Sequence, residues 1–301
     1  MSRRLIDISE RPMRLRVRGG LLVLRSPDPE AEEVTVPLGE VEGVMISHPQ
    51  CTVSATVMSE LGRWGVALVC CDQRRLPTGI MLPIGEHGRI ASRFALQARM
   101  SLPMRKKLWR QVVRAKIRNQ GSLLAQIHGS DHGLSALAAD VLSGDRTNVE
   151  ATAAVRYWRA LFADPDFRRD PGIGGRNALL NYGYAVMRGI VARAICGAGL
   201  HPAVGLHHHS RGNPLCLADD LMEPFRPIVD QTVAGFGLGA IDPPDLTRDV
   251  KAALLQALVG RFNVKNEQRT PSDIAERLVR SLARVVDGDA DRLWTPLIAF
   301  E

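Results

Sequence analysis

The residues from Met13 to Leu24, MRLRVRGGLLVL, set the architecture of the first part of the chain. Apolar residues alternate with arginines over its first six positions, and Gly19-Gly20 separates them from the apolar run Leu21–Leu24. A period of two is typical of a strand with one buried face, and a short glycine turn between two such runs is typical of a hairpin. We therefore predict a β-hairpin that carries arginines on one face.

Beyond the hairpin, short apolar runs punctuated by Gly and Pro continue to about residue 88. Four of them predict further strands: Val34–Val36, Gly43–Ser47, Val66–Cys71 and Ile80–Pro83. One helix is predicted near Val53–Trp64. These elements indicate a small β-rich N-terminal domain over residues 1–88, in which two sheets pack together.

After residue 88 the apolar spacing becomes helical almost throughout. The predicted helices cover residues 89–100, 102–127, 134–143, 148–163, 176–198, 214–236, 246–259 and 271–286. No strand pattern of comparable strength occurs here, so a larger all-α catalytic domain is expected over residues 89–301. The fold class is therefore α+β.

The composition of the chain limits the classes of binding partner and the cellular compartment that we expect. Lys and Arg number 39 against 32 Asp and Glu, which gives a net charge of +7. That excess favours a polyanionic partner, chiefly nucleic acid, although a basic protein without such a role has the same balance. The five cysteines form no C-x-x-C pair and indicate reduced thiols. With no secretory signal and no apolar run long enough to span a membrane, a cytoplasmic location is expected.

One predicted helix is crowded with cations. Lys107, Arg110, Arg114 and Arg118 follow helical spacing and would line one face. That face could supply phosphate contacts, which need positive charge and no base readout. It could equally be a solvated surface whose side chains pair with acids such as Asp131.

The densest polar cluster runs from Gly205 to Asp230, GLHHHSRGNPLCLADDLMEPFRPIVD. A helix that begins at Asn213-Pro214 would put Asp220 and Glu223 on one face, close to the histidine tract. Carboxylates with an imidazole can hold a divalent cation, and oxygen ligands favour Mg²⁺ or Mn²⁺ over zinc. The alternative is a helix whose first turns carry acids that suit its dipole, beside exposed histidines. Interior prolines at 224 and 227 also interrupt a helical pattern.

Glu150 is a second candidate, in the stretch Arg146-Thr-Asn-Val-Glu150. Thr147 and Glu150 match a capping box that precedes an apolar helical face. The spacing alone favours capping over chemistry, and nothing in the residues themselves brings Glu150 near His208.

Three segments together resemble the CRISPR-associated adaptation integrase family, closest to its type II branch. Glu150–Trp158, EATAAVRYW, is similar to the family's E-G-x-A-A stretch, with Ala151 where glycine is common. Gly175–Tyr184, GRNALLNYGY, is similar to its asparagine- and tyrosine-rich helix. Gly205–His208 followed by Leu217–Pro227, LADDLMEPFRP, is similar to its third motif. The order of a β-rich and a helical domain also agrees.

The resemblance implies that Glu150, His208 and Glu223 are metal ligands, with Asp220 a possible auxiliary acid and Mg²⁺ or Mn²⁺ as cofactor. The count from Gly205 in the family's G-x-x-H pattern selects His208 over its neighbours. The implied reaction is attack of a DNA 3′-hydroxyl on a phosphodiester of a repeat array, with hydrolysis when water replaces the hydroxyl. The family also implies a homodimer, with two dimers bridging a smaller partner protein. A structure-selective nuclease without an integrating role, or a basic DNA-binding scaffold, stays open as an alternative.

Overall fold

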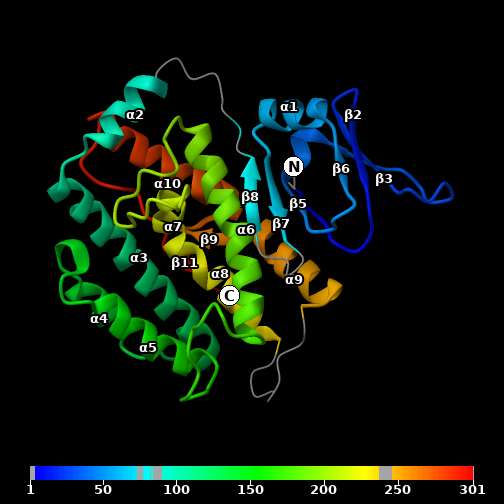
Figure 1. The fold of residues 1–301 in the computed structure, drawn as a ribbon. Coiled ribbons are helices and arrows are strands. Elements are labelled where there is room, and N and C mark those ends of the chain that lie inside the picture. Colours follow the sequence, from blue (N-terminus) through cyan, green and yellow to red (C-terminus); the bar gives the residue numbers. More distant parts are fainter. Residues whose placement is uncertain (1–3, 73–76, 82, 84–89, 237–245, 301) are drawn as a thin grey trace.

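A computed structural model describes residues 4–72, 77–81, 83, 90–236 and 246–300. A strand-rich N-terminal part lies beside a larger helical part (Figure 1), so the predicted fold class is confirmed. The predicted domain division between residues 88 and 89 lies outside the described residues, as does residue 89, where the first helix was expected to begin.

The N-terminal part contains two four-stranded sheets. The first has the order β1 (Arg4–Ile8), β5 (Val41–Ile46), β7 (Ala67–Cys71) and β8 (Pro77–Met81), with β8 antiparallel at the edge. The second has the order β4 (Val34–Pro37), β3 (Leu21–Arg25), β2 (Arg14–Arg18) and β6 (Thr52–Val53). Side chains from both sheets and from α1 (Ala55–Arg63) share one hydrophobic cluster. The predicted packing of two sheets is confirmed.

The hairpin at the start of the chain forms as predicted. Leu15 pairs with Leu24 and both are buried, whereas the arginines of β2 are exposed. Gly19 and Gly20 have φ angles of 57° and 76°. Positive φ at both central residues is the geometry of a tight hairpin turn that matches the twist of its strands, and glycine adopts it without strain. The sequence did not predict β1 or β6, and β8 begins three residues before the expected Ile80.

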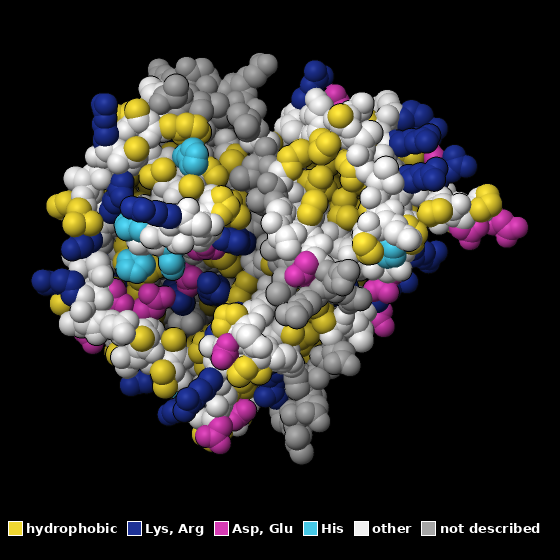
Figure 2. Space-filling model, viewed as in Figure 1, with side chains coloured by type: hydrophobic (Ala, Val, Ile, Leu, Met, Phe, Trp, Pro, Cys, Tyr) yellow, Lys and Arg dark blue, Asp and Glu magenta, His cyan; other side chains and the backbone are white. Residues whose placement is uncertain are grey.

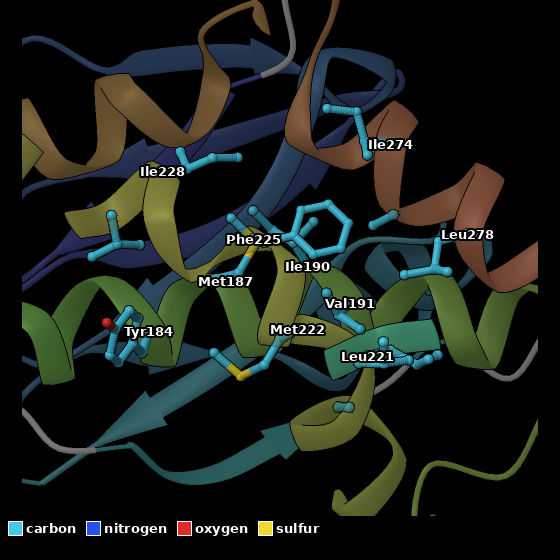
Figure 3. Packing of buried hydrophobic residues seen from close by; sticks show 14 of the residues in the cluster. Tyr184, Met187, Ile190, Val191, Leu221, Met222, Phe225, Ile228, Ile274 and Leu278 are labelled. Atoms are coloured by element: carbon cyan, nitrogen blue, oxygen red, sulfur yellow. The ribbon is translucent and has the colours of Figure 1, made fainter. Parts of the chain in front are cut away.

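The helical part contains two long helices, one of them at its centre, and shorter ones around them. The helices are α2 (Ile90–Ala98), α3 (Leu102–His128), α4 (Leu134–Asp140), α5 (Val149–Leu161), α6 (Arg176–Gly197), α7 (Cys216–Met222), α8 (Arg226–Gly235), α9 (Arg248–Val259) and α10 (Pro271–Val286). α6 lies at the centre of the core, where its apolar side chains face α7, α8 and α10 (Figure 3). No described helix is long and apolar enough to cross a membrane.

The single helix predicted over 214–236 is wrong in two respects. It begins at Cys216, because the Asn213 side chain accepts a hydrogen bond from the amide of Leu215 and holds the chain in a turn there. It is also broken at Pro224 into α7, the 3₁₀ turn η3 (Glu223–Phe225) and α8. A proline has no N–H to donate within a helix, which explains the break. The break gives Glu223 a place at the start of a new turn.

Three short strands in the helical part were not predicted. β9 (Phe262–Val264) pairs with β10 (Glu267–Arg269) and with β11 (Ile298–Ala299). The amide of buried Asn119 on α3 binds this segment: Asn119 Nδ2 donates to the carbonyls of Pro224 (2.8 Å) and Pro296 (3.2 Å), and Asn119 Oδ1 accepts from Ile298 N (3.0 Å). One side chain thus joins α3, η3 and the last strand.

The two parts meet through α6 and α9. The Tyr182 hydroxyl on α6 donates to Asp7 at the end of β1 (3.0 Å), and Met45 and Val69 of the first sheet belong to the core of the helical part. The long α6 therefore connects the N-terminal sheet to the region described next.

Candidate active site

Asp220 on α7 holds the histidine segment in place. Its side chain is fully buried, and it accepts hydrogen bonds from the amides of Leu206 (2.6 Å), His207 (3.0 Å) and His208 (3.2 Å). It also contacts His208 Nδ1 at 2.6 Å. Both carboxylate oxygens are therefore used inside the protein, and the possible auxiliary ligand of the sequence prediction is an anchor for the loop in this structure.

Gly205 makes this anchor possible. A Cβ atom at position 205 would lie 2.5 Å from the His208 carbonyl oxygen and 2.8 Å from Asp220 Oδ2. No side chain fits at those distances. The first glycine of the sequence motif is thus required by close packing of the loop on Asp220.

The three histidines of the loop have different environments. His208 donates through Nδ1 to Asp220, which leaves Nε2 at the opposite side of a ring that is 46% exposed. The hydrogen bond with Asp220 raises the pKa of His208 despite partial burial. His207 stacks on Trp109 at a ring separation of 4.4 Å, and exposed His209 contacts the carbonyl of His208. His208 alone has its ring oriented by a carboxylate.

Glu150 and Glu223 meet at one buried ammonium group. Lys116 Nζ on α3 lies 2.6 Å from Glu150 Oε1 and 2.5 Å from Glu223 Oε2. The lysine side chain is 12% exposed, and those of Glu150 and Glu223 are 24% and 5% exposed. Two of the sequence-predicted residues, which lie 73 positions apart in the chain, therefore share a single cation.

The capping role that the spacing favoured for Glu150 is wrong. Asn148 precedes α5 in a left-handed conformation with a φ of 54°. The Asp145 carboxylate accepts instead from the amides of Val149 (2.9 Å) and Glu150 (3.0 Å), so it does the capping. The Glu150 side chain is left to turn toward Lys116.

Arg226 is the second cation at Glu223. Its Nε and Nη2 both lie 2.8 Å from Glu223 Oε1. Burial tends to raise the pKa of Glu223, but Arg226 and Lys116 outweigh it and lower the pKa to about 2. Burial likewise tends to lower the pKa of Lys116, and the two glutamates raise it overall. Glu223 and Lys116 are therefore both charged throughout the physiological range.

The histidines and the glutamates lie along one side of α3. Trp109, which carries the His207 stack, is seven residues before Lys116, or about two helical turns. Figure 2 shows histidine side chains beside acidic and basic ones around a hollow in the helical part. In the part of the chain that the structure describes, no three His, Cys, Asp or Glu side chains meet at metal-binding distances as they stand.

The donor set nevertheless suits a hard divalent cation. Two carboxylates and an oriented imidazole are ligands that Mg²⁺ and Mn²⁺ accept in proteins. Lys116 already supplies positive charge between the two carboxylates. The residues therefore fit such an ion in chemistry and in charge, with Lys116 as its competitor.

A cavity of about 730 Å³ is lined by Lys116 and Arg226, the two cations that contact Glu223. Lys116 lines it together with four arginines: Arg159, Arg168, Arg169 and Arg226. Cations gathered around a cavity of this size suit an anionic ligand.

Behind this cavity, Asp230 accepts hydrogen bonds from the hydroxyls of Tyr157 (2.7 Å) and Tyr184. All three groups are buried, and the guanidinium of Arg226 lies 4.4 Å from the centre of the Tyr184 ring. This network supports Arg226 and through it Glu223.

The cationic face predicted on α3 is partly engaged within the protein. Lys107 pairs with Asp291 (3.1 Å), and Arg114 donates to the carbonyl of Ala139 (2.7 Å). Arg118 is exposed. Burial and the neighbouring charges of Arg110 and Arg118 lower the pKa of Arg114, so these cations crowd one another.

Sequence reasoning missed Lys116, Arg226 and Asp230 as site residues. Lys116 carries a usable signal, because it falls four residues after Val112 on the apolar face of its helix. A lone cation on a buried face needs a buried anion as its partner.

The chain is similar in sequence to proteins of one named family. A family model described as "CRISPR associated protein Cas1" matches residues 6–259. The CRISPR-associated endonuclease Cas1 of Neisseria meningitidis serogroup C (strain 8013) is 36% identical over 271 residues, which cover 89% of this chain and 88% of that protein.

Two solved structures share the fold. A casposase bound to integration product matches with a TM-score of 0.76 at 21% identity, over 95% of this chain and 91% of that one. A chain of a Cas6-RT-Cas1–Cas2 complex matches with a TM-score of 0.73 at 15% identity, over 98% of this chain and 36% of that one. With a family match across most of its length, the chain belongs to the CRISPR-associated Cas1 family.

Proposed function

We propose that this protein is a metal-dependent endonuclease and integrase of CRISPR spacer acquisition, which joins short DNA fragments to a repeat array. The observation that carries the proposal is the meeting of Glu150 and Glu223 at one cation, Lys116, on the side of α3 where Trp109 packs against His207 and the oriented His208. The Neisseria relative is named an endonuclease, which supports a nuclease in the same family.

In this proposal Glu150, His208 and Glu223 hold Mg²⁺ or Mn²⁺. Asp220 is a positioning residue, because its oxygens are already engaged by the loop amides and by His208. The bound ion would activate the attacking hydroxyl and offset the charge that develops on the phosphate. The cations of the adjoining cavity would hold the phosphates on either side of the reacting bond.

The substrate is a DNA strand with a 3′-hydroxyl. Its oxygen forms a new bond to phosphorus in the repeat, and the bond from that phosphorus to the departing 3′-oxygen breaks, so the number of phosphodiesters is conserved. The departing oxygen takes up a proton as the attacking hydroxyl loses one. Hydrolysis follows the same course with water as nucleophile.

We further propose a homodimer that acts on DNA in the cytoplasm with a smaller partner protein. One structural neighbour is part of a Cas6-RT-Cas1–Cas2 complex and another is a casposase bound to integration product, which supports the proposal of a partner protein and of DNA. Residues 1–88 are proposed as the domain that makes the dimer and partner contacts.

The test incubates the protein with its partner, labelled duplex fragments and a repeat-bearing plasmid, in Mg²⁺ or Mn²⁺ and after chelation with EDTA. We expect covalent joining that EDTA abolishes. Cutting without joining would favour the structure-selective nuclease, and full activity after exhaustive chelation would refute the metal-dependent mechanism.

The same assay tests the ligands one by one. Glu150→Ala, His208→Ala and Glu223→Ala are each expected to lower cutting and joining roughly a hundredfold or more, since ligands of one ion act as a unit. His209→Ala is the matched control, because that ring is exposed and has no carboxylate partner among the described residues. A larger loss in His209→Ala or His207→Ala than in His208→Ala would show that another imidazole is the ligand.

A further inference from the structure

Lys116 occupies the place that a cation would take between the proposed ligands. Its ammonium is within 2.6 Å of both glutamates, and Arg226 takes the other oxygen of Glu223. An ion bound by Glu223 therefore meets Lys116 at Oε2 or Arg226 at Oε1, and two positive charges at one oxygen repel each other. Of the two cations, Lys116 is the easier to displace from the Glu223 carboxylate. Its ammonium is a single point charge on a flexible chain, whereas Arg226 binds with two nitrogens and packs on Tyr184.

We infer that Lys116 is an internal cation that competes with the metal for Glu150 and Glu223, and that a DNA phosphate in the adjoining cavity draws it away. DNA binding and metal binding then strengthen each other through one side chain. This inference rests on the proposed function and adds to it the means by which the site is kept closed to metal until DNA arrives.

The cavity gives the displaced ammonium a destination. Lys116 lines the cavity and the site at once, and four arginines share its wall. A phosphodiester there would accept a hydrogen bond from Lys116 in place of the one that Glu150 accepts in this structure. The described residues that line the cavity include four arginines and the amide of Gln120 but no carboxylate, so without DNA the ammonium stays with the glutamates.

Binding of Mn²⁺ itself provides the test, by electron paramagnetic resonance of the free ion. The wild-type chain, Lys116→Met and Lys116→Gln are titrated alone and with a short DNA duplex, against a duplex-only blank. Lys106→Met is the matched control, since it removes an equal charge from an exposed position on the same helix. A thermal melt of each variant with and without Mn²⁺ accompanies the titrations.

Alone, Lys116→Met is expected to bind Mn²⁺ about tenfold more tightly than the wild type, and its melt should rise more on adding the ion. The duplex should tighten Mn²⁺ binding to the wild type and to Lys106→Met by a similar factor, and should have little effect on either Lys116 variant. Lys116→Gln can still donate one hydrogen bond to the glutamates, so it covers the case in which Lys116→Met does not fold.

Equal or weaker Mn²⁺ binding in the Lys116 variants would overturn the inference, and so would a wild-type affinity that DNA does not change. These outcomes leave the proposed function standing as long as Mn²⁺ binds. If Mn²⁺ binds to no version of the protein, with or without DNA, the proposed function fails instead.

Discussion

Asp220 and Glu223 are three residues apart, and the structure gives their carboxylates different tasks. Asp220 faces the histidine loop and fixes the orientation of His208, whereas Glu223 faces α3 and shares Lys116 with Glu150. The proline that follows Glu223 separates the two roles, since it ends α7 and starts a new turn.

The anchor at Asp220 predicts a strong effect of Gly205→Ala. The added methyl would overlap the His208 carbonyl and Asp220 Oδ2, so the loop must move and His208 loses its orientation. We expect cutting to fall at least about tenfold while the helical core stays folded. Circular dichroism, a thermal melt and the nuclease assay measure this.

Gly212→Ala is the control, because a Cβ there has nothing within 4 Å. It lies in the same loop and makes the same chemical change. If both variants cut DNA equally well, close packing at Gly205 does not position the histidine.

Asp230 predicts a pH effect on stability. Burial raises its pKa to about 7 from 3.8, against the hydrogen bonds from the two tyrosines. The folded protein therefore holds this proton more tightly than the unfolded chain, and the stability it contributes at low pH is lost as pH rises from about 4 to about 7. Relative to Asp230→Asn, which cannot ionise, the wild type should lose about 1–3 kcal/mol between pH 5 and pH 8.

Urea unfolding of both proteins at the two pH values measures this difference. Comparison with the variant cancels the titration of the other groups, including Glu223. Parallel stability at both pH values would mean that Asp230 stays ionised in the folded protein.

Among the elements, α3 connects several parts of the site. One side of it carries Trp109 and Lys116, which contact the histidine loop and the glutamates. The cations of the predicted phosphate face crowd another side, where Arg118 is exposed and Lys107 has a solvent-exposed acid as partner.

Neutralising Lys107, Arg110, Arg114 and Arg118 to Gln tests whether this face binds DNA. For each cation that binds a phosphate in the wild type, its removal should make the slope of log affinity against log salt shallower by about 0.9 on duplex DNA. Affinity should fall about equally on unrelated sequences, because phosphate contacts carry no base information.

Binding at several salt concentrations, beside a thermal melt, gives the answer. The pairs of Lys107 with Asp291 and of Arg114 with Ala139 are exposed, so we expect only a small decrease in stability. An unchanged slope in a folded variant would exclude this helix from the DNA path.

The elements also show how far the sequence could predict the structure. The hairpin at Met13–Leu24 and the long helices follow from local periodicity, so they could be predicted. The proline at 224 predicted an interruption of the helix, but it did not predict that the interruption would turn Glu223 toward α3. The strands β9 and β11 are very short and depend on pairing across more than thirty residues, which local patterns do not encode.

The prediction of the site depended on the family resemblance. The residues alone favoured capping for Glu150, and only the fold brings that residue to Lys116. Asp145 was the competing cap, and its role could not be seen because the left-handed Asn148 shifts the start of the helix.

Across the whole molecule, Asn119 joins three distant segments by its amide group. Asn119→Ala would leave two buried carbonyls and one N–H without this partner, at about 1–3 kcal/mol for each unsatisfied group. We expect the free energy of unfolding to fall by several kcal/mol, and cutting to fall because η3 is no longer fixed.

Ser122→Ala is the matched control one turn further along α3. Among the described residues, the Ser122 hydroxyl donates one hydrogen bond, to the carbonyl of Ile298 (2.9 Å), and none to η3. Denaturant unfolding and the nuclease assay compare the two. Equal losses in both would show that Asn119 only fastens the last strand and does not support Glu223.

The position of that last strand has a consequence for how the protein is made. A ribosome delivers α3, α5 and η3 well before it delivers Ile298, and until then the amide of Asn119 lacks two of its three partners. The three hydrogen bonds that join Asn119 to η3 and to the last strand are therefore complete only once Ile298 has emerged. A nascent or prematurely terminated chain that ends before Pro296 would therefore carry Glu150, His208 and Glu223 but would lack two of the three hydrogen bonds of Asn119.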